Sequence, residues 1–244
     1  TIALEIIDEL KDVDAIIVPI GGVGLISGIS VAAKSINPDI KIIGVQAEGA
    51  NPMKISFDTG KLTYADKVDT IADGAAVKNP GDLTFEVIKE YVDEIVTVSD
   101  QELMEAVFVI LEKHKLIAEA TGAMSLAALK RLNFKGKKVV SLISGGNIDV
   151  VTIASLLNKG LFSRGRIFCF SVNLQDTPGQ LLKIAQILAE EGANVIKLEH
   201  NQFKSVDRLK HVGLEVTVET NGYEHIEDIV KKLNDHGYDV HRVC

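Results

Sequence analysis

The chain has 244 residues, of which 46% are hydrophobic and 25% are charged, and its formal net charge at pH 7 is −8. This composition is typical of a globular protein with one large or two small domains, and an acidic chain without a cluster of lysine or arginine disfavours nucleic acid and anionic membranes as partners. No apolar stretch approaches the roughly 18 residues of a membrane-crossing helix, the first residues lack a signal-peptide pattern, and Cys169 and Cys244 form no disulfide or metal motif, so we expect a cytoplasmic protein.

The first 159 residues or so alternate between strand-like and helix-like segments. The pattern is already helical at residue 1, with no capping residue before it, so we expect the chain to be a fragment. Ser99, followed three residues later by Glu102, forms a capping box that predicts the start of a helix. In chain order the patterns predict a strand over 15–18, a helix over 24–35, a strand-like run over 40–49, a polar stretch over 51–82, a strand over 94–98, helices over 100–115 and 121–132, and a strand within 137–147.

This alternation predicts a parallel α/β sheet, in which ligands bind beyond the carboxyl ends of the strands. Two glycine-rich breaks, at 21–24 and 144–147, each follow a predicted strand and should open at that edge. Backbone N–H groups of a glycine loop at a helix start form an anion site. The first break therefore predicts a phosphate cradle, and the alternative is a tight strand-to-helix turn without a ligand.

The pattern changes near residue 162, where we place the boundary between a first domain of 1–161 and a second of 162–244. Pro178 and Gly192 mark the two ends of the first helix of the second domain. An edge strand of a four-stranded sheet needs cover, so we expect two copies to pair side by side. Strands over 166–174, 193–201, 210–220 and 238–243 and helices over 176–192 and 222–237 follow the order βαββαβ of the ferredoxin-like motif.

Four blocks of the first domain resemble, in order and spacing, those of the threonine and serine dehydratases, which are pyridoxal-phosphate enzymes of the tryptophan-synthase β type (fold-type II). The blocks are PIGGVGLISG (19–28), TIADGAAV (70–77), AEATGA (118–123) and SGGNID (144–149). The tail with DTPGQL (176–181) is similar to an ACT domain, an amino-acid-sensing module. The resemblance covers essentially the whole chain. It implies an α/β protein made of the C-terminal part of the catalytic domain followed by a regulatory ACT domain.

The resemblance further implies pyridoxal 5'-phosphate as the cofactor and the deamination of L-threonine to 2-oxobutanoate and ammonia, with L-serine as a second candidate substrate. Ser144 would hydrogen-bond the pyridine nitrogen, and Glu119 would lie near the ring and the substrate as a catalytic residue. Capping of the helix near Thr121 is an equally good interpretation of Glu119. Val23 replaces the commoner glycine and is expected to hold a φ that a β-branched residue can adopt. Backbone N–H groups would bind the cofactor phosphate from Gly21, Gly22, Val23, Gly24 and Leu25.

In the ACT domain the resemblance implies an effector site shared by two modules. Helix capping by Asp176 would explain part of the pattern without an effector. Some relatives bind a divalent cation with acidic residues after the second strand, where this chain has Gln46 and Pro52, so no metal site is expected. The implied effector residues are Asp176, Gly179, Gln180 and Leu181 of one module and Asn194, Val195 and Ile196 of the other.

The Schiff-base lysine of this family stands in a Ser-x-Lys-x-Arg block upstream of the glycine loop, and no lysine of this chain has that context. Lys34 lies at a predicted helix end, and Lys135, Lys137 and Lys138 precede a predicted strand. We therefore expect an N-terminal part of the same enzyme to be missing. The 244 residues alone should have no lyase activity.

Two other functions stay open on the sequence. A purely regulatory amino-acid-binding protein would carry the ACT domain on an inactive scaffold. A Rossmann nucleotide-binding protein would use Gly22 and Gly24, but the strict fingerprint needs its third glycine where Ser27 stands, and this chain has Gly28 instead. Gln46 stands where that fold needs an acid for the ribose, and Glu48 is a weak substitute.

Overall fold

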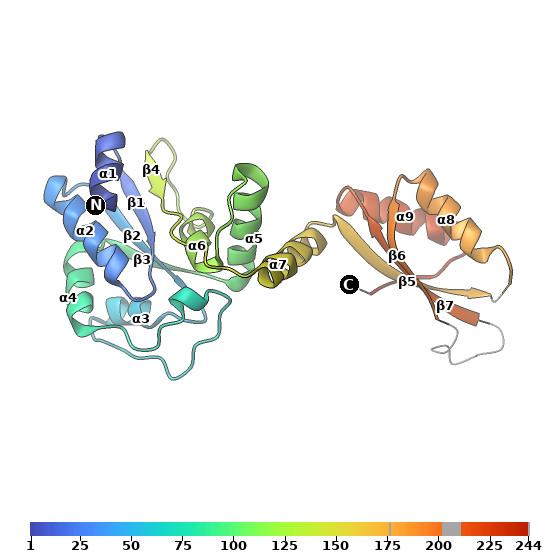
Figure 1. Cartoon of the computed structure of the whole chain (residues 1–244), viewed down its shortest axis with the longest axis horizontal. Helices are drawn as coiled ribbons and strands as arrows, with labels where there is room; N and C mark the ends of the chain where they lie inside the picture. The colour runs from blue at the N-terminus through green and yellow to red at the C-terminus, as the bar shows by residue number, and fades with distance from the viewer. Residues whose placement is uncertain (176, 202–210, 244) are drawn as a thin grey trace. The chain divides into compact units, whose positions relative to one another are not determined.

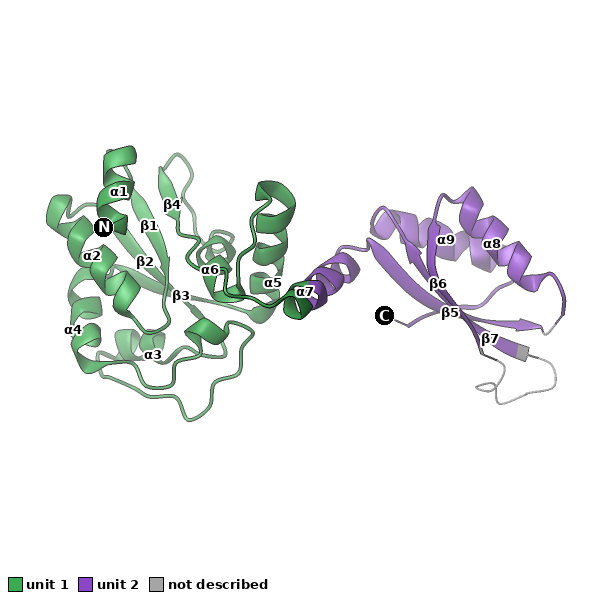
Figure 2. Cartoon of the chain, in the orientation of Figure 1, with its two compact units in different colours: residues 1–153 green, residues 154–244 purple. Residues whose placement is uncertain are grey.

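The computed structural model describes residues 1–175, 177–201 and 211–243. The chain divides into two compact units, residues 1–153 and 154–244 (Figure 2). The division falls inside α7 (Val150–Ser163). The domain boundary expected near residue 162 stays a prediction.

The first unit is built on a four-stranded parallel sheet in the order β3-β2-β1-β4 (Figure 1). Its central strand β1 is buried along its whole length, as a continuous apolar run in a parallel sheet should be. Ile16 and Val18 face one side of the sheet and Ile17 the other. The predicted parallel α/β sheet is therefore confirmed. Its strands are β1 (Ala15–Pro19), β2 (Lys41–Ala47), β3 (Glu94–Val98) and β4 (Val139–Ser141).

Helices cover both faces of this sheet, so that the core lies in two layers. Apolar residues of α1 (Ile2–Glu9), α2 (Gly24–Ile36) and α4 (Asp82–Tyr91) pack on one face. Those of α5 (Asp100–Val109) and α6 (Ala120–Ala128) pack on the other. The layers leave the strand ends free to carry loops at the carboxyl edge.

The polar stretch predicted over 51–82 contains more structure than its pattern suggested. It holds α3 (Pro52–Thr59), opened by proline in the first turn, and a 3₁₀ turn, η1 (Asp73–Ala75). Ser56 is fully buried in α3, where its hydroxyl donates to Pro52 O at 2.7 Å. A serine with its hydroxyl hydrogen-bonded within the helix thus fills a core-facing position that would otherwise be apolar. The hydrophobic periodicity of this helix is therefore interrupted and hard to recognise in the sequence.

The predicted helix over 100–115 has the expected start and an altered end. α5 begins with the capping box of Ser99 and Glu102, both halves of which are present. After Val109 the helix widens into a π-helical turn, η2 (Ile110–His114), and stops at Lys115, whose φ is 58°. The capping-box prediction is confirmed.

The second unit is a four-stranded antiparallel sheet in the order β6-β7-β5-β8, with two helices packed on one face. This arrangement confirms the predicted βαββαβ order. Its first helix begins after Gly179, the N-cap residue at φ 92°, so Pro178 lies just outside the helix that we expected it to open. Its elements are β5 (Ile167–Gln175), α8 (Gln180–Glu190), β6 (Asn194–Asn201), β7 (His211–Glu219), α9 (Tyr223–Asp235) and β8 (Val240–Arg242). Over the described ranges, no helix has both the length and the apolar character needed to cross a bilayer.

Candidate cofactor site

The glycine-rich break after β1 is a left-handed turn into α2. α2 begins at Gly24, with Val23 as its N-cap residue at φ 69° and ψ −18°. We expected Val23 to hold a φ suited to a β-branched side chain, and this expectation was wrong, because such residues rarely have positive φ. The Val23 side chain is only 2% exposed and belongs to the core beneath α2. This burial holds the backbone in its strained conformation.

The turn leaves a row of backbone N–H groups without acceptors. In the described part of the chain, none of the N–H groups of residues 21–26 donates a hydrogen bond, whereas Ile20 N–H donates to Val45 O at 2.8 Å and Ser27 N–H to Val23 O at 3.1 Å. The first turn of α2 also has no side-chain cap and no acidic residue. Unpaired N–H groups at the positive end of a helix dipole favour a bound anion.

The second sequence block lies directly behind this turn. Its residues Asp73–Ala75 form the 3₁₀ turn η1. A Cβ atom on Gly21 would lie 2.7 Å from Gly74 O, closer than real Cβ atoms come to backbone, so only glycine fits there. At Gly22 and Gly24 a Cβ would meet no described atom within 4 Å. The loop is therefore supported on one side and open beside these two glycines.

The third and fourth blocks continue this line of close contacts. A Cβ on Gly74 would lie 3.1 Å from Thr121 Oγ1, and one on Gly122 would lie 2.4 Å from Gly145 O. Glu119 donates its backbone N–H to Gly145 O at 3.1 Å. All four blocks thus meet at the carboxyl edge of the sheet, although they are far apart in the sequence.

Glu119 and Ser144, the side chains expected beside the cofactor ring, lie on the same line. A Cβ on Gly145 would lie 2.0 Å from Glu119 Oε1, so this carboxylate rests against the loop after β4. Glu119 is the N-cap residue of α6, at the helix start where the capping interpretation places it, although its side chain makes no capping hydrogen bond. Ser144 is exposed and immediately precedes Gly145.

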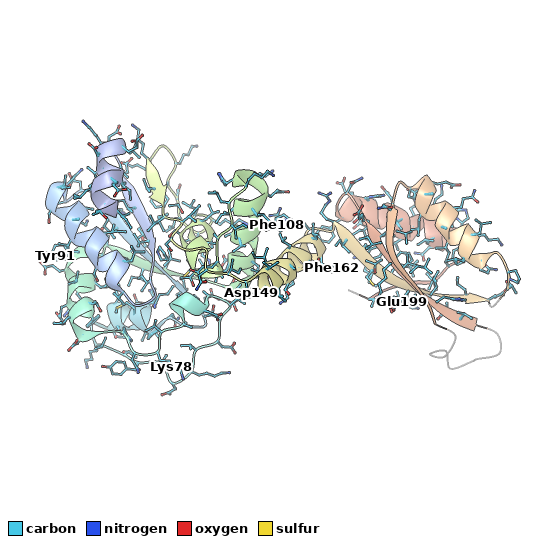
Figure 3. The ribbon with its side chains drawn as sticks, viewed as in Figure 1. Lys78, Tyr91, Phe108, Asp149, Phe162 and Glu199 are labelled. Atoms are coloured by element: carbon cyan, nitrogen blue, oxygen red, sulfur yellow. The ribbon has the colours of Figure 1, made fainter. Side chains whose placement is uncertain are left out.

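Asp149 ends the fourth block and ties its loop to the first turn of α7 (Figure 3). Its Oδ1 accepts hydrogen bonds from the N–H groups of Val151 and Thr152 at 2.9 and 3.0 Å. The Thr152 hydroxyl also donates to this carboxylate, which is the main reason that the pKa of Asp149 lies below its usual value. Aspartate is a preferred residue before a helix, so the sequence carried a signal for this cap that we did not use.

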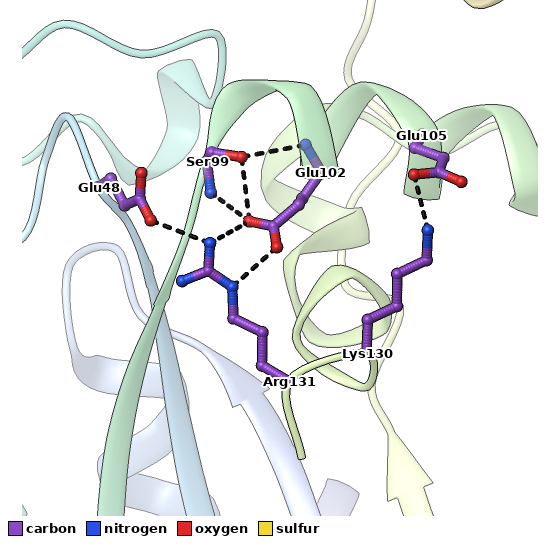
Figure 4. A network of polar contacts seen from close by, with 6 residues as sticks. All are labelled: Glu48, Ser99, Glu102, Glu105, Lys130 and Arg131. Carbon is purple, nitrogen blue, oxygen red and sulfur yellow. Dashed lines mark hydrogen bonds and ion pairs between the residues drawn. The ribbon is translucent and has the colours of Figure 1, made fainter. Parts of the chain in front are cut away.

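A network of ion pairs and hydrogen bonds lies at the same edge of the sheet, next to α5 (Figure 4). The Arg131 guanidinium donates to Glu102 Oε2 at 2.7 Å and to Glu48 Oε1 at 3.0 Å, so it joins the end of β2 to α5. Burial disfavours the ionised form of Glu102, but hydrogen bonds from Arg131 and Ser99 outweigh it and lower the pKa of Glu102. This network was not predicted from the sequence.

The same contacts weaken the nucleotide-binding alternative. Glu48, the substitute acid for a ribose, is paired with Arg131. The Gln46 side chain is 1% exposed, and its Oε1 accepts the Lys54 N–H at 2.8 Å within α3. Gln46 is therefore not available to a ribose hydroxyl, and Glu48 is already engaged by an arginine. As for metals, the described residues contain no group of three or more His, Cys, Asp and Glu side chains placed to hold an ion.

Three of the four lysines singled out in the sequence, Lys34, Lys137 and Lys138, lie away from the glycine loop. Lys34 pairs with Asp93 at 2.8 Å, just before β3 begins. Lys137 pairs at 2.9 Å with Asp14, which precedes β1, and Lys138 leads into β4. These three lie at the amino ends of parallel strands, whereas the loops of the candidate site follow the carboxyl ends.

The expected effector residues do not come together within one ACT module. Gly179, Gln180 and Leu181 follow the end of β5, where Gln175 pairs with His211. Asn194, Val195 and Ile196 begin β6, where Asn194 pairs with Glu219 at the other end of β7. Val195 and Ile196 are 39% and 50% exposed, and Asn194 Nδ2 donates to Glu219 Oε2 at 3.1 Å. Asp176 lies outside the described residues.

Comparison with known proteins decides the family. The family model "Pyridoxal-phosphate dependent enzyme" matches residues 1–145. The chain belongs to this family. This pyridoxal-phosphate family member also matches the ACT domain model over residues 170–237. Both parts of the predicted fold, and the expected cofactor pyridoxal 5'-phosphate, are therefore confirmed.

Its relatives include proteins named for threonine deamination. It is 46% identical over 241 residues to an L-threonine ammonia-lyase of Thermotoga maritima and 40% identical over 240 residues to one of Geobacter sulfurreducens. Each match covers 98% of this chain and 60% of the relative. The chain thus spans less than two thirds of the curated relatives that it matches.

Solved structures agree with this assignment. The crystal structure of a threonine deaminase from T.th. has a TM-score of 0.57 and 33% identity, covering 60% of this chain and 56% of the other. Maize serine racemase has a TM-score of 0.59 and 35% identity, covering 66% of this chain and 51% of the other. These similarities support the tryptophan-synthase β type of fold that was expected from the sequence blocks.

The residues of the turn between β1 and α2 are suited to bind the phosphate of this cofactor. The N–H groups of 21–26 lack acceptors among the described residues, and Gly22 and Gly24 border open space. Thr121 Oγ1 is buried at the same edge without a hydrogen-bond partner in the described structure, and an orphaned buried hydroxyl calls for a partner. The unpaired N–H groups and the open space beside them suit a phosphate dianion.

Proposed function

We propose that the protein containing this chain deaminates L-threonine to 2-oxobutanoate and ammonia by pyridoxal-phosphate-dependent elimination, with L-serine as a second substrate. The observation that carries the proposal is the line of close backbone contacts that joins all four sequence blocks beside the unpaired N–H groups of 21–26. The names of the curated relatives supply the substrate. Serine racemase and serine ammonia-lyase among the structural neighbours support serine as the second substrate.

Each residue has a defined task in this proposal. The N–H groups of Gly21, Gly22, Val23, Gly24 and Leu25 bind the phosphate, whose charge also interacts favourably with the start of α2. When bound, the cofactor supplies an electron sink for negative charge at the α-carbon of the substrate. Ser144 donates its hydroxyl to the pyridine nitrogen, because a hydroxyl can hold that nitrogen without fully protonating it. Glu119 supplies a carboxylate beside the ring and the substrate.

The lysine that binds the cofactor covalently is assigned to a segment outside these 244 residues. Lys34, Lys137 and Lys138 are engaged at the opposite edge of the sheet. Without such a lysine, the base that removes the α-proton is missing. The 244-residue chain by itself is therefore inactive.

The test of this proposal is 2-oxobutanoate release from L-threonine with added cofactor. We expect release from the whole protein and none above the free-cofactor rate from the 244-residue chain. A whole protein that binds the cofactor and amino acids but releases no keto acid from threonine or serine would instead support the purely regulatory alternative.

The ACT domain is proposed to bind an amino-acid effector between two modules of a homo-oligomer. Because the residues at Gly179 and at Asn194 lie at opposite ends of one sheet, a complete site needs the second module. N–H groups at the start of α8 suit the effector carboxylate, and the side-chain oxygens of Asp176 and Asn194 suit its ammonium. Calorimetric titration of the chain with isoleucine, valine, serine and threonine tests this. No heat with any of them, together with a monomeric chain, would leave the module without an effector role.

A further inference from the structure

The loop behind the glycine turn is held in place by one carboxylate. Asp100, the first residue of α5, accepts the Thr70 hydroxyl on Oδ1 at 2.6 Å and the Ile71 N–H on Oδ2 at 3.2 Å. Thr70 Oγ1 in turn accepts the Ala72 N–H at 3.2 Å. Asp100 thus fixes residues 70 and 71 directly and Ala72 through the Thr70 hydroxyl, just before the 3₁₀ turn that contains Gly74.

The other end of this loop is fixed against β2. The Asp69 N–H donates to Gly49 O at 2.9 Å, and a Cβ on Gly49 would lie 1.7 Å from Asp69 O. The backbone segments at 49 and 69 are therefore in direct contact, with no room for a side chain between them. Residues 69–72 are attached at two points, Gly49 and Asp100.

Arg131 connects these two points. Its guanidinium binds Glu48, the neighbour of Gly49, and Glu102, two residues after Asp100 (Figure 4). A planar guanidinium that binds two carboxylates fixes their distance better than a flexible ammonium. The network therefore keeps Gly49 and Asp100 at the spacing that residues 69–72 require.

We infer that Asp100 is a positioning residue for the cofactor: it fixes residues 70–72, which hold Gly74 O behind Gly21 and so keep the N–H groups of the glycine turn in place for the phosphate. The phosphate part of this inference rests on the proposed function. Both oxygens of Asp100 accept hydrogen bonds, so an asparagine would present an NH₂ group to one of two donors. This isosteric change, which also removes the negative charge of Asp100, is therefore enough to loosen the loop.

The test uses the full 244-residue chain and four variants. Asp100→Asn removes the charged acceptor of this contact, and Thr70→Val removes the donating hydroxyl. Thr70→Ser keeps the hydroxyl as a conservative variant. Asp82→Asn is the matched control: Asp82 is likewise the first residue of a helix, but the one hydrogen bond that its side chain accepts among the described residues comes from the neighbouring Leu83 N–H. Amide hydrogen exchange of residues 71–76 without ligand and the dissociation constant for pyridoxal 5'-phosphate are measured for each.

We expect Asp100→Asn to speed exchange at 71–76 by about tenfold or more and to weaken cofactor binding by about tenfold, since a hydrogen bond to a charged group is lost. Thr70→Val should act in the same direction, and Thr70→Ser and Asp82→Asn should stay within about twofold of the wild type. Wild-type exchange at 71–76 in both Asp100→Asn and Thr70→Val would overturn the inference. So would faster exchange with unchanged cofactor affinity.

Failure of the proposed function would look different. If the wild-type chain does not bind pyridoxal 5'-phosphate at all, the cofactor role of the glycine turn is contradicted. Exchange at 71–76, measured without ligand, then decides alone whether Asp100 positions the loop.

Discussion

Replacing Gly21 by alanine should lower the thermal stability of the chain, because the new methyl group would overpack the glycine turn against η1. The new Cβ would lie 2.7 Å from Gly74 O and 3.3 Å from Ala75 Cα, both of which are backbone atoms that cannot rotate away. The first distance is about 0.7 Å short of ordinary van der Waals contact, and interiors are too closely packed to absorb such a shift freely. Overpacking of this kind costs about 1–3 kcal/mol of unfolding free energy. For a protein of this size the melting temperature should fall by roughly 3–10 °C.

Gly24→Ala provides the matched control in the same loop. Its Cβ would meet no described atom within 4 Å, and alanine at a helix start is neutral or slightly stabilising. Thermal unfolding followed by circular dichroism should therefore show destabilisation in Gly21→Ala alone. Equal melting temperatures for the two variants would refute the close contact between Gly21 and Gly74 on which the arrangement of the four blocks depends.

Three further predictions concern the site and its supports. Gly22→Asp in the whole protein should abolish cofactor retention after dialysis without unfolding it, because the new carboxylate would repel the phosphate dianion; retention equal to that of the parent would mean that the loop binds no phosphate. Ser144→Ala in the whole protein should leave the cofactor bound and slow keto-acid release, and an unchanged rate would remove Ser144 from the ring contact. Glu102→Gln should cost about 1 kcal/mol of stability at pH 7, since the ion pair with Arg131 is partly exposed. The pKa of Glu102 is lowered from 4.5 in the folded chain, so the ionised carboxylate stabilises the fold fully above pH 4.5 and progressively less below it. The free energies of unfolding of the wild type and Glu102→Gln should therefore converge as the pH falls in acid titrations. A difference that grows as the pH falls would contradict the assigned ion pair.

The sheet and the glycine breaks could be predicted because their signals are local. The apolar run at β1 and the capping box of Ser99 and Glu102 each lie within a window of a few residues, where burial and capping leave a visible pattern. The same holds for the βαββαβ order of the second unit. Local patterns were enough to place both loops at one edge of the sheet.

The supports of the site could not be predicted because their partners are far apart in the chain. Thr70 and Asp100 are 30 residues apart, and Glu48 and Arg131 are 83 apart, so neither contact creates a period or a short motif. The positive φ of Val23 was also hidden, since it depends on the core that buries its side chain. Propensity alone argues against that conformation, and tertiary packing overrides it.

The central claim is that the turn between β1 and α2 binds the phosphate of the cofactor. The most direct test compares the affinity of the 244-residue chain for pyridoxal 5'-phosphate with its affinity for pyridoxal, which has the same ring and aldehyde but no phosphate. Several charge-assisted hydrogen bonds from residues 21–25 should make the phosphorylated form bind about 100-fold tighter or more. Equal affinity for the two compounds would contradict the phosphate cradle and the account built on it.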